Sequence, residues 1–104
     1  MIVEQRTYRL QPGSVRDYLQ TYEQEGLPLQ RKYLGRLIGY FHTDIGPLSE
    51  VVHLWAYDDL NDRSARRAAL SADPAWQDYA PKIFRFIVAQ ENKILVPAPF
   101  SPLY

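Results

Sequence analysis

Segments rich in β-branched and aromatic residues, partly alternating with polar ones, recur along this 104-residue chain. Turn residues separate them: Pro12 and Gly13 follow the first segment, and Gly46 and Pro47 lie between the second and the third. The pattern therefore predicts four strands, at residues 2–10, 36–44, 50–58 and 88–96.

The first two predicted strands are separated by apolar residues that recur at helical spacing. Ser14 can cap a helix that begins there, and the pattern extends through Tyr33. Gly26 is a residue typical of a helix end, and Pro28 cannot donate a backbone hydrogen bond. We therefore expect this helical region to be interrupted near residues 26–28.

A second helical region covers residues 58–72, and Asp73 with Pro74 predicts the cap and first position of a further helix. Pro81 predicts a kink or a restart in that helix. The resulting order, β-α-β-β-α-β, is typical of a ferredoxin-like α+β fold with helices on one face of a sheet. No repeat or linker divides the chain, so we expect residues 1–104 to form one domain.

Strand parity divides the segment VVHLWAY into two faces. We expect Val52, Leu54 and Ala56 to lie beneath the helices, because these side chains are small and aliphatic. The opposite face is also apolar and aromatic, and it consists of Val51, His53, Trp55 and Tyr57. A second copy of the chain is the simplest cover for that face, so parity predicts a homodimer with its sheets packed face to face.

Six short motifs follow one another along almost the whole chain: ExRxYxLxPG at residues 4–13, GYF at 39–41, HLWAY at 53–57, RxxRRxxL at 63–70, DPAW at 73–76 and ILVPAPFSPL at 94–103. Their order and spacing together resemble the NIPSNAP family. The resemblance implies a dimeric α+β barrel and no settled activity. Similar barrels include cofactor-independent monooxygenases, dismutase-like haem proteins and small isomerases.

Composition narrows the class of protein. Twelve basic residues balance twelve acidic ones, which argues against electrostatic steering onto nucleic acid or an anionic membrane. The chain has no cysteine, which excludes disulfides, thiolate metal sites and cysteine nucleophiles. No segment has the pattern of a signal peptide or approaches the roughly 20 apolar residues of a membrane helix. We therefore expect a cytoplasmic protein that binds neither nucleic acid nor membrane.

The first strand supplies the first candidate site residues, because parity places Glu4, Arg6 and Tyr8 on one face. We expect this face to look into the barrel, where it would meet His53, Trp55 and Tyr57. A few polar groups in an apolar pocket are typical of a small-molecule site. The structural alternative is that Glu4 and Arg6 pair with each other, or across the dimer, and fix the strand register.

His53 is the candidate catalytic residue, since an imidazole titrates near neutral pH and can act as an acid or a base. The alternative is a core histidine that bonds to a backbone carbonyl or to Tyr8. A symmetric hairpin loop predicts His42 opposite His53 and Tyr40 opposite Trp55, which adds His42 and Tyr40 to the candidate ligand-binding residues.

Two histidines do not make a metal site without a third ligand placed beside them. Glu4 or Asp44 could supply a carboxylate, but nothing in the spacing brings either one close. We therefore predict no metal and no cofactor.

The acidic and basic residues of the second helical region, residues 58–72, favour a solvated surface. Asp59 and Arg63, like Asp62 and Arg66, stand four positions apart with the acid first, the order that stabilises a helix. Arg67 has no such partner. The alternative is a basic patch for phosphate or an acidic substrate.

Two functions remain open. The first is a cofactor-independent site for an aromatic or apolar acid, with His53 as acid or base and with Tyr8, Tyr57 or Arg6 orienting the substrate. The second is a non-enzymatic interaction module whose barrel is packed solid. A cavity beside His53 would favour the first.

Overall fold

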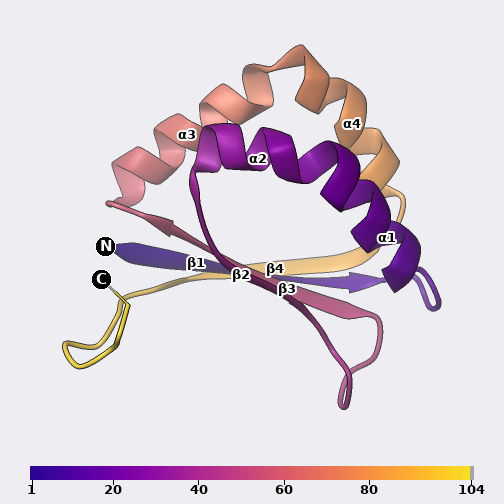
Figure 1. Ribbon diagram of the computed structural model, residues 1–104, viewed down its shortest axis with the longest axis horizontal. Coiled ribbons are helices and arrows are strands. Elements are labelled where there is room, and N and C mark those ends of the chain that lie inside the picture. The colour runs from indigo at the N-terminus through magenta and orange to yellow at the C-terminus, as the bar shows by residue number, and fades with distance from the viewer. Residues whose placement is uncertain (104) are drawn as a thin grey trace.

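Four antiparallel strands form one sheet, and the helices of the described chain lie on one of its faces (Figure 1). In this computed structural model, which describes residues 1–103, the strand order is β2-β3-β1-β4. The strands are β1 (Ile2–Leu10), β2 (Arg36–His42), β3 (Glu50–Tyr57) and β4 (Ile87–Leu95). This topology confirms the predicted ferredoxin-like α+β fold.

The first helical region changes its geometry near residues 26–28, where the sequence predicted an interruption, although the backbone dihedral angles remain helical. It consists of α1 (Val15–Thr21), the wider π-helical turn η1 (Tyr22–Gly26) and α2 (Leu27–Leu34). Pro28 is accommodated because it lies in the first turn of α2, directly after a π-helical turn in which the regular α-helical hydrogen bonding is already interrupted. Gly26 has a helical φ of −88°, and a β-carbon there would overlap the Tyr79 hydroxyl. Gly26 therefore permits close packing, and α2 ends at Gly35, whose φ of 85° is left-handed.

The second helical region consists of α3 (Leu60–Ala72) and α4 (Pro74–Phe84), and both helices have side-chain caps. The Asp59 carboxylate accepts a hydrogen bond from the Asp62 N–H, and the Asp73 carboxylate accepts one from the Ala75 N–H, each at 2.7 Å. The predicted restart at Pro81 does not occur, because burial of the surrounding face of α4 holds the helix together.

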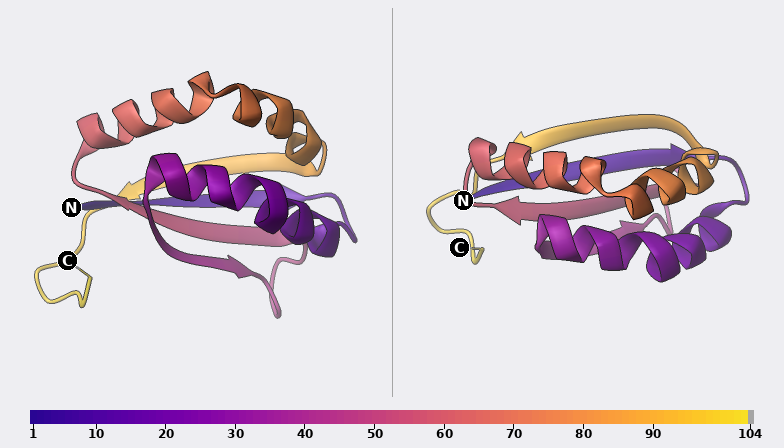
Figure 2. Two further views of the ribbon diagram at one scale, coloured as in Figure 1. Left: turned by 45° about the horizontal axis from the view of Figure 1, so that its top comes forward. Right: turned by 90° about the horizontal axis from the view of Figure 1, so that it is seen from above.

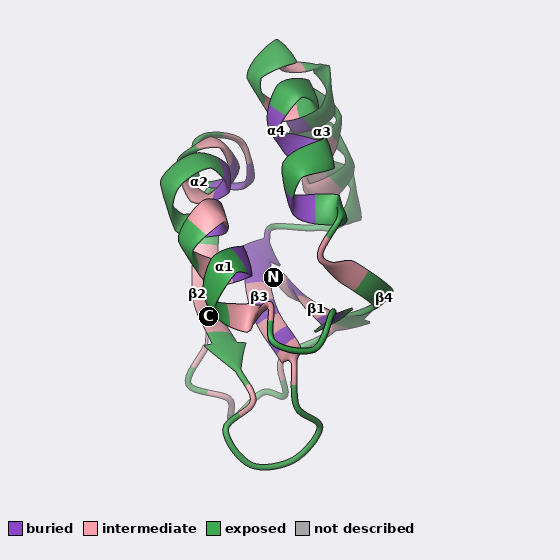
Figure 3. Cartoon of the chain, turned by 90° about the vertical axis from the view of Figure 1, so that its right-hand side faces the viewer, coloured by how far each residue is buried: buried purple, intermediate pink, exposed green. Residues whose placement is uncertain are grey.

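The helices cover the sheet face opposite to the one predicted. Val52 and Leu54, expected beneath the helices, are half-buried on the outer face. Four side chains of β3 lie instead between the sheet and the helices and are at most 3% exposed, namely Val51, His53, Trp55 and Tyr57. Figure 3 shows buried stretches, in purple, on the sheet and on the helices above it. Strand parity shows which residues share a face, but it does not show which face the helices cover. The face with the large rings is the covered one, because large side chains fill the space between the sheet and the helical layer.

The two helical regions run side by side across the sheet (Figure 2). α2 packs against α3, and η1 packs against α4. No helix in the described part of the chain is both long enough and apolar enough to cross a membrane.

The register of the β2–β3 hairpin differs from the symmetric prediction by two residues. Tyr40, and not His42, lies opposite His53, while His42 lies opposite Val51. An irregularity between Leu37 and Gly39 accompanies this pairing. A shift of two residues preserves the face of each side chain, so Tyr40 still points toward the helices.

Candidate functional site

The carboxylate of Glu4 lies at the centre of a charged cluster, and its side chain has no exposed surface. Its Oε2 accepts hydrogen bonds from Arg63 Nη2 at 2.7 Å, Asn92 Nδ2 at 2.7 Å and Arg6 Nη1 at 3.2 Å. Arg67 Nη1 lies 4.0 Å from the other oxygen, Oε1. Three guanidinium groups therefore surround one carboxylate, which leaves two positive charges in excess.

Two opposing effects set the charge state of Glu4. Burial by itself raises the pKa of this carboxyl, but hydrogen bonds from Arg63 and Asn92, with the charges of Arg6 and Arg63, lower it to about 2. The carboxylate is consequently ionised at neutral pH and is a poor proton acceptor. Its evident role is to hold the arginines.

His53 lies beside this cluster, and its hydrogen bonding determines where its proton is. Trp55 Nε1 donates a hydrogen bond to His53 Nδ1 at 2.9 Å. An indole N–H can only donate, so Nδ1 carries no proton and the neutral ring is protonated at Nε2. Burial, aided by the charge of Arg6, lowers the pKa of His53 to about 3. Nε2 is buried and has no partner among the described residues, so His53 offers an unused N–H donor.

Aromatic rings surround the imidazole. The Tyr40 ring stacks on His53 with centroids 4.5 Å apart, and Tyr8 meets it edge-on at 5.0 Å. The hydroxyls of Tyr40 and Tyr18 share a hydrogen bond of 2.6 Å. These contacts fix the rings in a packed wall on the helix side of the sheet.

The remaining tyrosines of this wall are also buried. The Tyr22 hydroxyl donates to Gln30 Oε1 at 2.6 Å, while the Tyr79 hydroxyl has no partner in the described chain. Burial raises the pKa of four of these phenols, so they stay protonated at neutral pH: Tyr18, Tyr22, Tyr40 and Tyr79.

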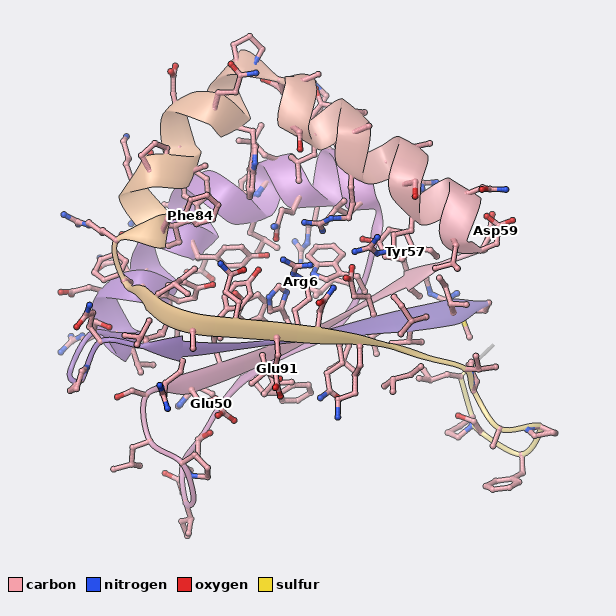
Figure 4. The ribbon with its side chains drawn as sticks, turned by 180° about the vertical axis from the view of Figure 1, so that it is seen from behind. Arg6, Glu50, Tyr57, Asp59, Phe84 and Glu91 are labelled. Carbon is pink, nitrogen blue, oxygen red and sulfur yellow. The ribbon has the colours of Figure 1, made fainter. Side chains whose placement is uncertain are left out.

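A cavity of about 180 Å³ lies between the sheet and the helices, bounded by these side chains. In Figure 4, Arg6 projects from β1 into this space, and Phe84 approaches it from the end of α4. Arg67, Gln90 and Ser71 add polar groups to the lining. The rings that face the cavity are Tyr8, Tyr18, Tyr22, Tyr40, His53, Trp76, Tyr79 and Phe84.

The structure places half of the eight predicted site residues around one cavity. Four of them line the cavity, namely Arg6, Tyr8, Tyr40 and His53. Glu4 does not line the cavity, but its carboxylate accepts a hydrogen bond from Arg6, which does.

Three other predicted residues have different positions. Trp55 is buried and holds the His53 ring through its indole N–H. Tyr57 lines a separate, more open groove of about 350 Å³ with Arg66. His42 is exposed and lies at the rim of another groove beside Phe41.

The sequence interpretation missed the inward arginines of α3. Asp62 and Arg66 form the predicted ion pair at 2.8 Å, but Asp59 caps the helix and Arg63 bonds to Glu4 instead. One sequence feature could have revealed their position: Arg63 and Arg67 are spaced so that they share a helix face with the apolar Leu70, which is buried. The prediction of a solvated surface was wrong for Arg63 and Arg67, because the buried carboxylate of Glu4 attracts their guanidinium groups inward.

Within residues 1–103, no group of three or more histidine, aspartate or glutamate side chains is close enough to hold a metal ion. The acid that was considered as a third ligand, Glu4, is bound by three donor residues instead.

Comparison with known proteins identifies relatives over nearly the whole chain. The family model described as NIPSNAP matches residues 3–102. The crystal structure of a NIPSNAP family protein of unknown function from Agrobacterium tumefaciens is 51% identical, with a TM-score of 0.98, and the match covers 100% of this chain and 94% of that one.

A curated relative, protein NipSnap from Drosophila melanogaster, is 31% identical over 101 residues, which cover 97% of this chain and 36% of the relative. The chain spans between 19% and 41% of the length of the first curated relatives that it matches. The structure of a putative antibiotic biosynthesis monooxygenase from Nitrosomonas europaea superimposes on this one over 100% of both chains, with a TM-score of 0.65 and 12% sequence identity. At that identity the likeness shows the fold alone.

Proposed function

Because this chain belongs to the NIPSNAP family, which has no established activity, we propose a function from the geometry of its site. The domain binds a small molecule with a flat apolar or aromatic body in the cavity between the sheet and the helices, and it does so without a cofactor. The observation that carries the proposal is the ring-lined cavity beside the unused N–H of His53.

The dimensions of the cavity support a small ligand. Its volume of about 180 Å³ lies below the roughly 300–1,000 Å³ of pockets for drug-sized molecules. An apolar cavity of about 150 Å³ is known to accommodate benzene. A single aromatic ring with one polar substituent therefore fits the available space.

The hydrogen bond from Trp55 supports binding more directly than catalysis. His53 Nε2 already carries a proton, so only Nδ1 could accept one. Nδ1 would first have to lose its hydrogen bond from Trp55. With its pKa lowered to about 3, the ring is also a weak base. We therefore propose that His53 donates a hydrogen bond to the ligand and is not the acid/base of a reaction.

Blocking the cavity tests this proposal. Ser71 lines the cavity from α3 and is exposed, so Ser71→Trp places a large ring at the edge of the cavity with little strain. Ligand-observed NMR with p-cresol, benzamide and benzoate should detect binding to the native protein, and Ser71→Trp should abolish it.

The control is Ser64→Trp, the same substitution at an exposed position of α3 that does not line the cavity. It should leave binding unchanged, and circular dichroism should show that both variants are folded. Equal binding by native protein and Ser71→Trp would contradict the location of the site. Failure of every probe to bind the native protein would favour the interaction module.

The alternative, an interaction module, has its own supporting observation. Ile45 and Leu48 in the β2–β3 loop are 93% and 70% exposed, and Phe100 in the C-terminal segment is 90% exposed. Exposed large apolar side chains are typical of surfaces that contact a partner. We propose a second copy of the chain as the first partner to test, and we retain the cytoplasmic location as a prediction from the cysteine-free composition.

A further inference from the structure

The cavity presents more hydrogen-bond donors than acceptors. His53 Nε2–H, the Tyr79 hydroxyl and Arg67 Nη1 are all buried and have no hydrogen-bond partner among residues 1–103. Tyr18 and Tyr40 share a single hydrogen bond, so one of their two hydroxyl protons remains available. A ligand that satisfies this lining must bring acceptors.

Charge favours the same kind of ligand. The cluster around Glu4 has two positive charges in excess, and the cavity lining includes Arg6 and Arg67 but not Glu4. A ligand in the cavity therefore meets the guanidinium groups and not the carboxylate. Uncompensated charge away from bulk water is costly, and an anion beside the arginines relieves that cost.

We propose that the ligand is an organic carboxylate and that Arg67, with Arg6, is its anion receptor. This inference rests on the proposed function, because it assigns the charged group of the molecule bound in the same cavity. The apolar body of the ligand lies against the tyrosine rings, and His53 Nε2–H donates a hydrogen bond to its carboxylate.

Arg67 is the residue best prepared for this role. Arg63 already bonds to Glu4 at 2.7 Å, and Arg6 bonds to both Glu4 and Tyr8. Arg67 lies 4.0 Å from Glu4 and also interacts with the Tyr57 hydroxyl, but its buried Nη1 has no hydrogen-bond partner among the described residues, so this atom is available to a second carboxylate. Its side chain is 27% exposed, which gives an incoming anion access to it from solvent.

Glu4 is a positioning residue in this arrangement. Along β1 the side chains facing the helices run from Glu4 through Arg6 to Tyr8, with successive members about 7 Å apart. The single step from Arg6, in the charged cluster, to Tyr8, in the aromatic wall, is therefore about 7 Å, close to the length of a one-ring acid. Glu4 fixes the arginines at one end of the cavity, and the tyrosines form the other.

A matched acid and amide test the inference, because benzoate and benzamide have nearly the same shape and differ in charge. Isothermal titration of the native protein should give a dissociation constant at least about tenfold lower for benzoate than for benzamide. Arg67→Gln should weaken benzoate binding by about tenfold and leave benzamide within about twofold, while Arg67→Lys should recover part of the loss.

The control variant is Arg66→Gln, one position away on α3, because Arg66 pairs with Asp62 and lies outside the cavity lining. It should leave both affinities unchanged. Equal binding of benzoate and benzamide, or an equal loss of both in Arg67→Gln, overturns the carboxylate assignment while the binding cavity stands. Failure of benzoate, benzamide and p-cresol alike to bind the native protein overturns the proposed function as well.

Discussion

Glu4 organises more of the site than any other single residue. It is fully buried and binds groups from β1, α3 and β4 at once, through Arg6, Arg63 and Asn92. A buried carboxylate of this kind ties separate elements together through charge-assisted hydrogen bonds. Its removal leaves guanidinium groups without a counter-charge, and that consequence can be measured.

We predict that Glu4→Gln destabilises the protein by about 3 kcal/mol at pH 7 in urea unfolding, since breaking a buried ion pair leaves uncompensated charge. The lowered pKa leads to a similar magnitude, because the change from 4.5 to about 2 corresponds to about 3 kcal/mol. Glu25→Gln, which breaks the exposed pair with Lys82, is the control and should cost less than about 1 kcal/mol.

The same variant has a predicted pH signature. The folded state holds Glu4 ionised at a pH where the unfolded chain has already bound a proton, so its stabilisation is complete above about pH 4.5 and is lost as the pH falls toward 2. The stability difference between native protein and Glu4→Gln should therefore shrink across that window. A difference that stays constant from pH 7 to pH 2 would show that the carboxylate charge is not responsible.

At the scale of elements, η1 and α4 pack closely against each other. The π-helical turn brings Gly26 so close to Tyr79 that no side chain fits between them. The Tyr79 hydroxyl lines the cavity and bonds to no other described group. The contact therefore links helix packing to the ligand site.

Gly26→Ala should destabilise the protein by about 1–3 kcal/mol through overpacking, although alanine normally stabilises a helix relative to glycine. Tyr79→Phe removes the nearest overlapping atom, the hydroxyl oxygen, and leaves the ring Cζ 2.6 Å from the added β-carbon. The change should itself cost little, because that hydroxyl has no partner in the described chain. A double-mutant cycle measured by thermal unfolding should show that Gly26→Ala costs less, though still destabilises, in the Tyr79→Phe background. Equal costs in the two backgrounds would show that the hydroxyl does not limit packing.

At the scale of the whole molecule, the sheet has one face without helices. Figure 1 shows the sheet from its edge, with the helices above it and no helix below it. Figure 4 shows Glu50 and Glu91 on this outer face, directed away from the helices. Val52, Leu54 and Phe41 share the face, so it combines apolar and charged side chains.

We predict a homodimer through this outer face, because a second sheet would cover Val52 and Leu54. Sedimentation velocity at micromolar concentration should show a dimer, and Leu54→Lys should convert it to a monomer by placing a charge in the interface. Leu60→Lys, at an exposed leucine of α3, should leave the dimer intact. A native protein that sediments as a monomer would remove the prediction.

Much of the fold and part of the site could be predicted from local pattern. The turn residues at 12–13 and 46–47 and the caps at Asp59 and Asp73 determine where elements begin and end, since these signals act within a few residues. Alternation along β1 and β3 also placed Glu4, Arg6, Tyr8 and His53 on one face, because the side-chain period of a strand is two.

The sequence by itself determined which residues share a strand face, where the elements lie and that the order is β-α-β-β-α-β. Only the tertiary structure decided which face the helices cover, which residue opposes His53, and where the α3 arginines point. Those outcomes depend on packing between layers and on the attraction of a buried carboxylate, which act between residues far apart in the chain. Arg67 is the clearest case, because the charge that attracts it, Glu4, lies on the first strand and becomes its neighbour only when the sheet and α3 pack together.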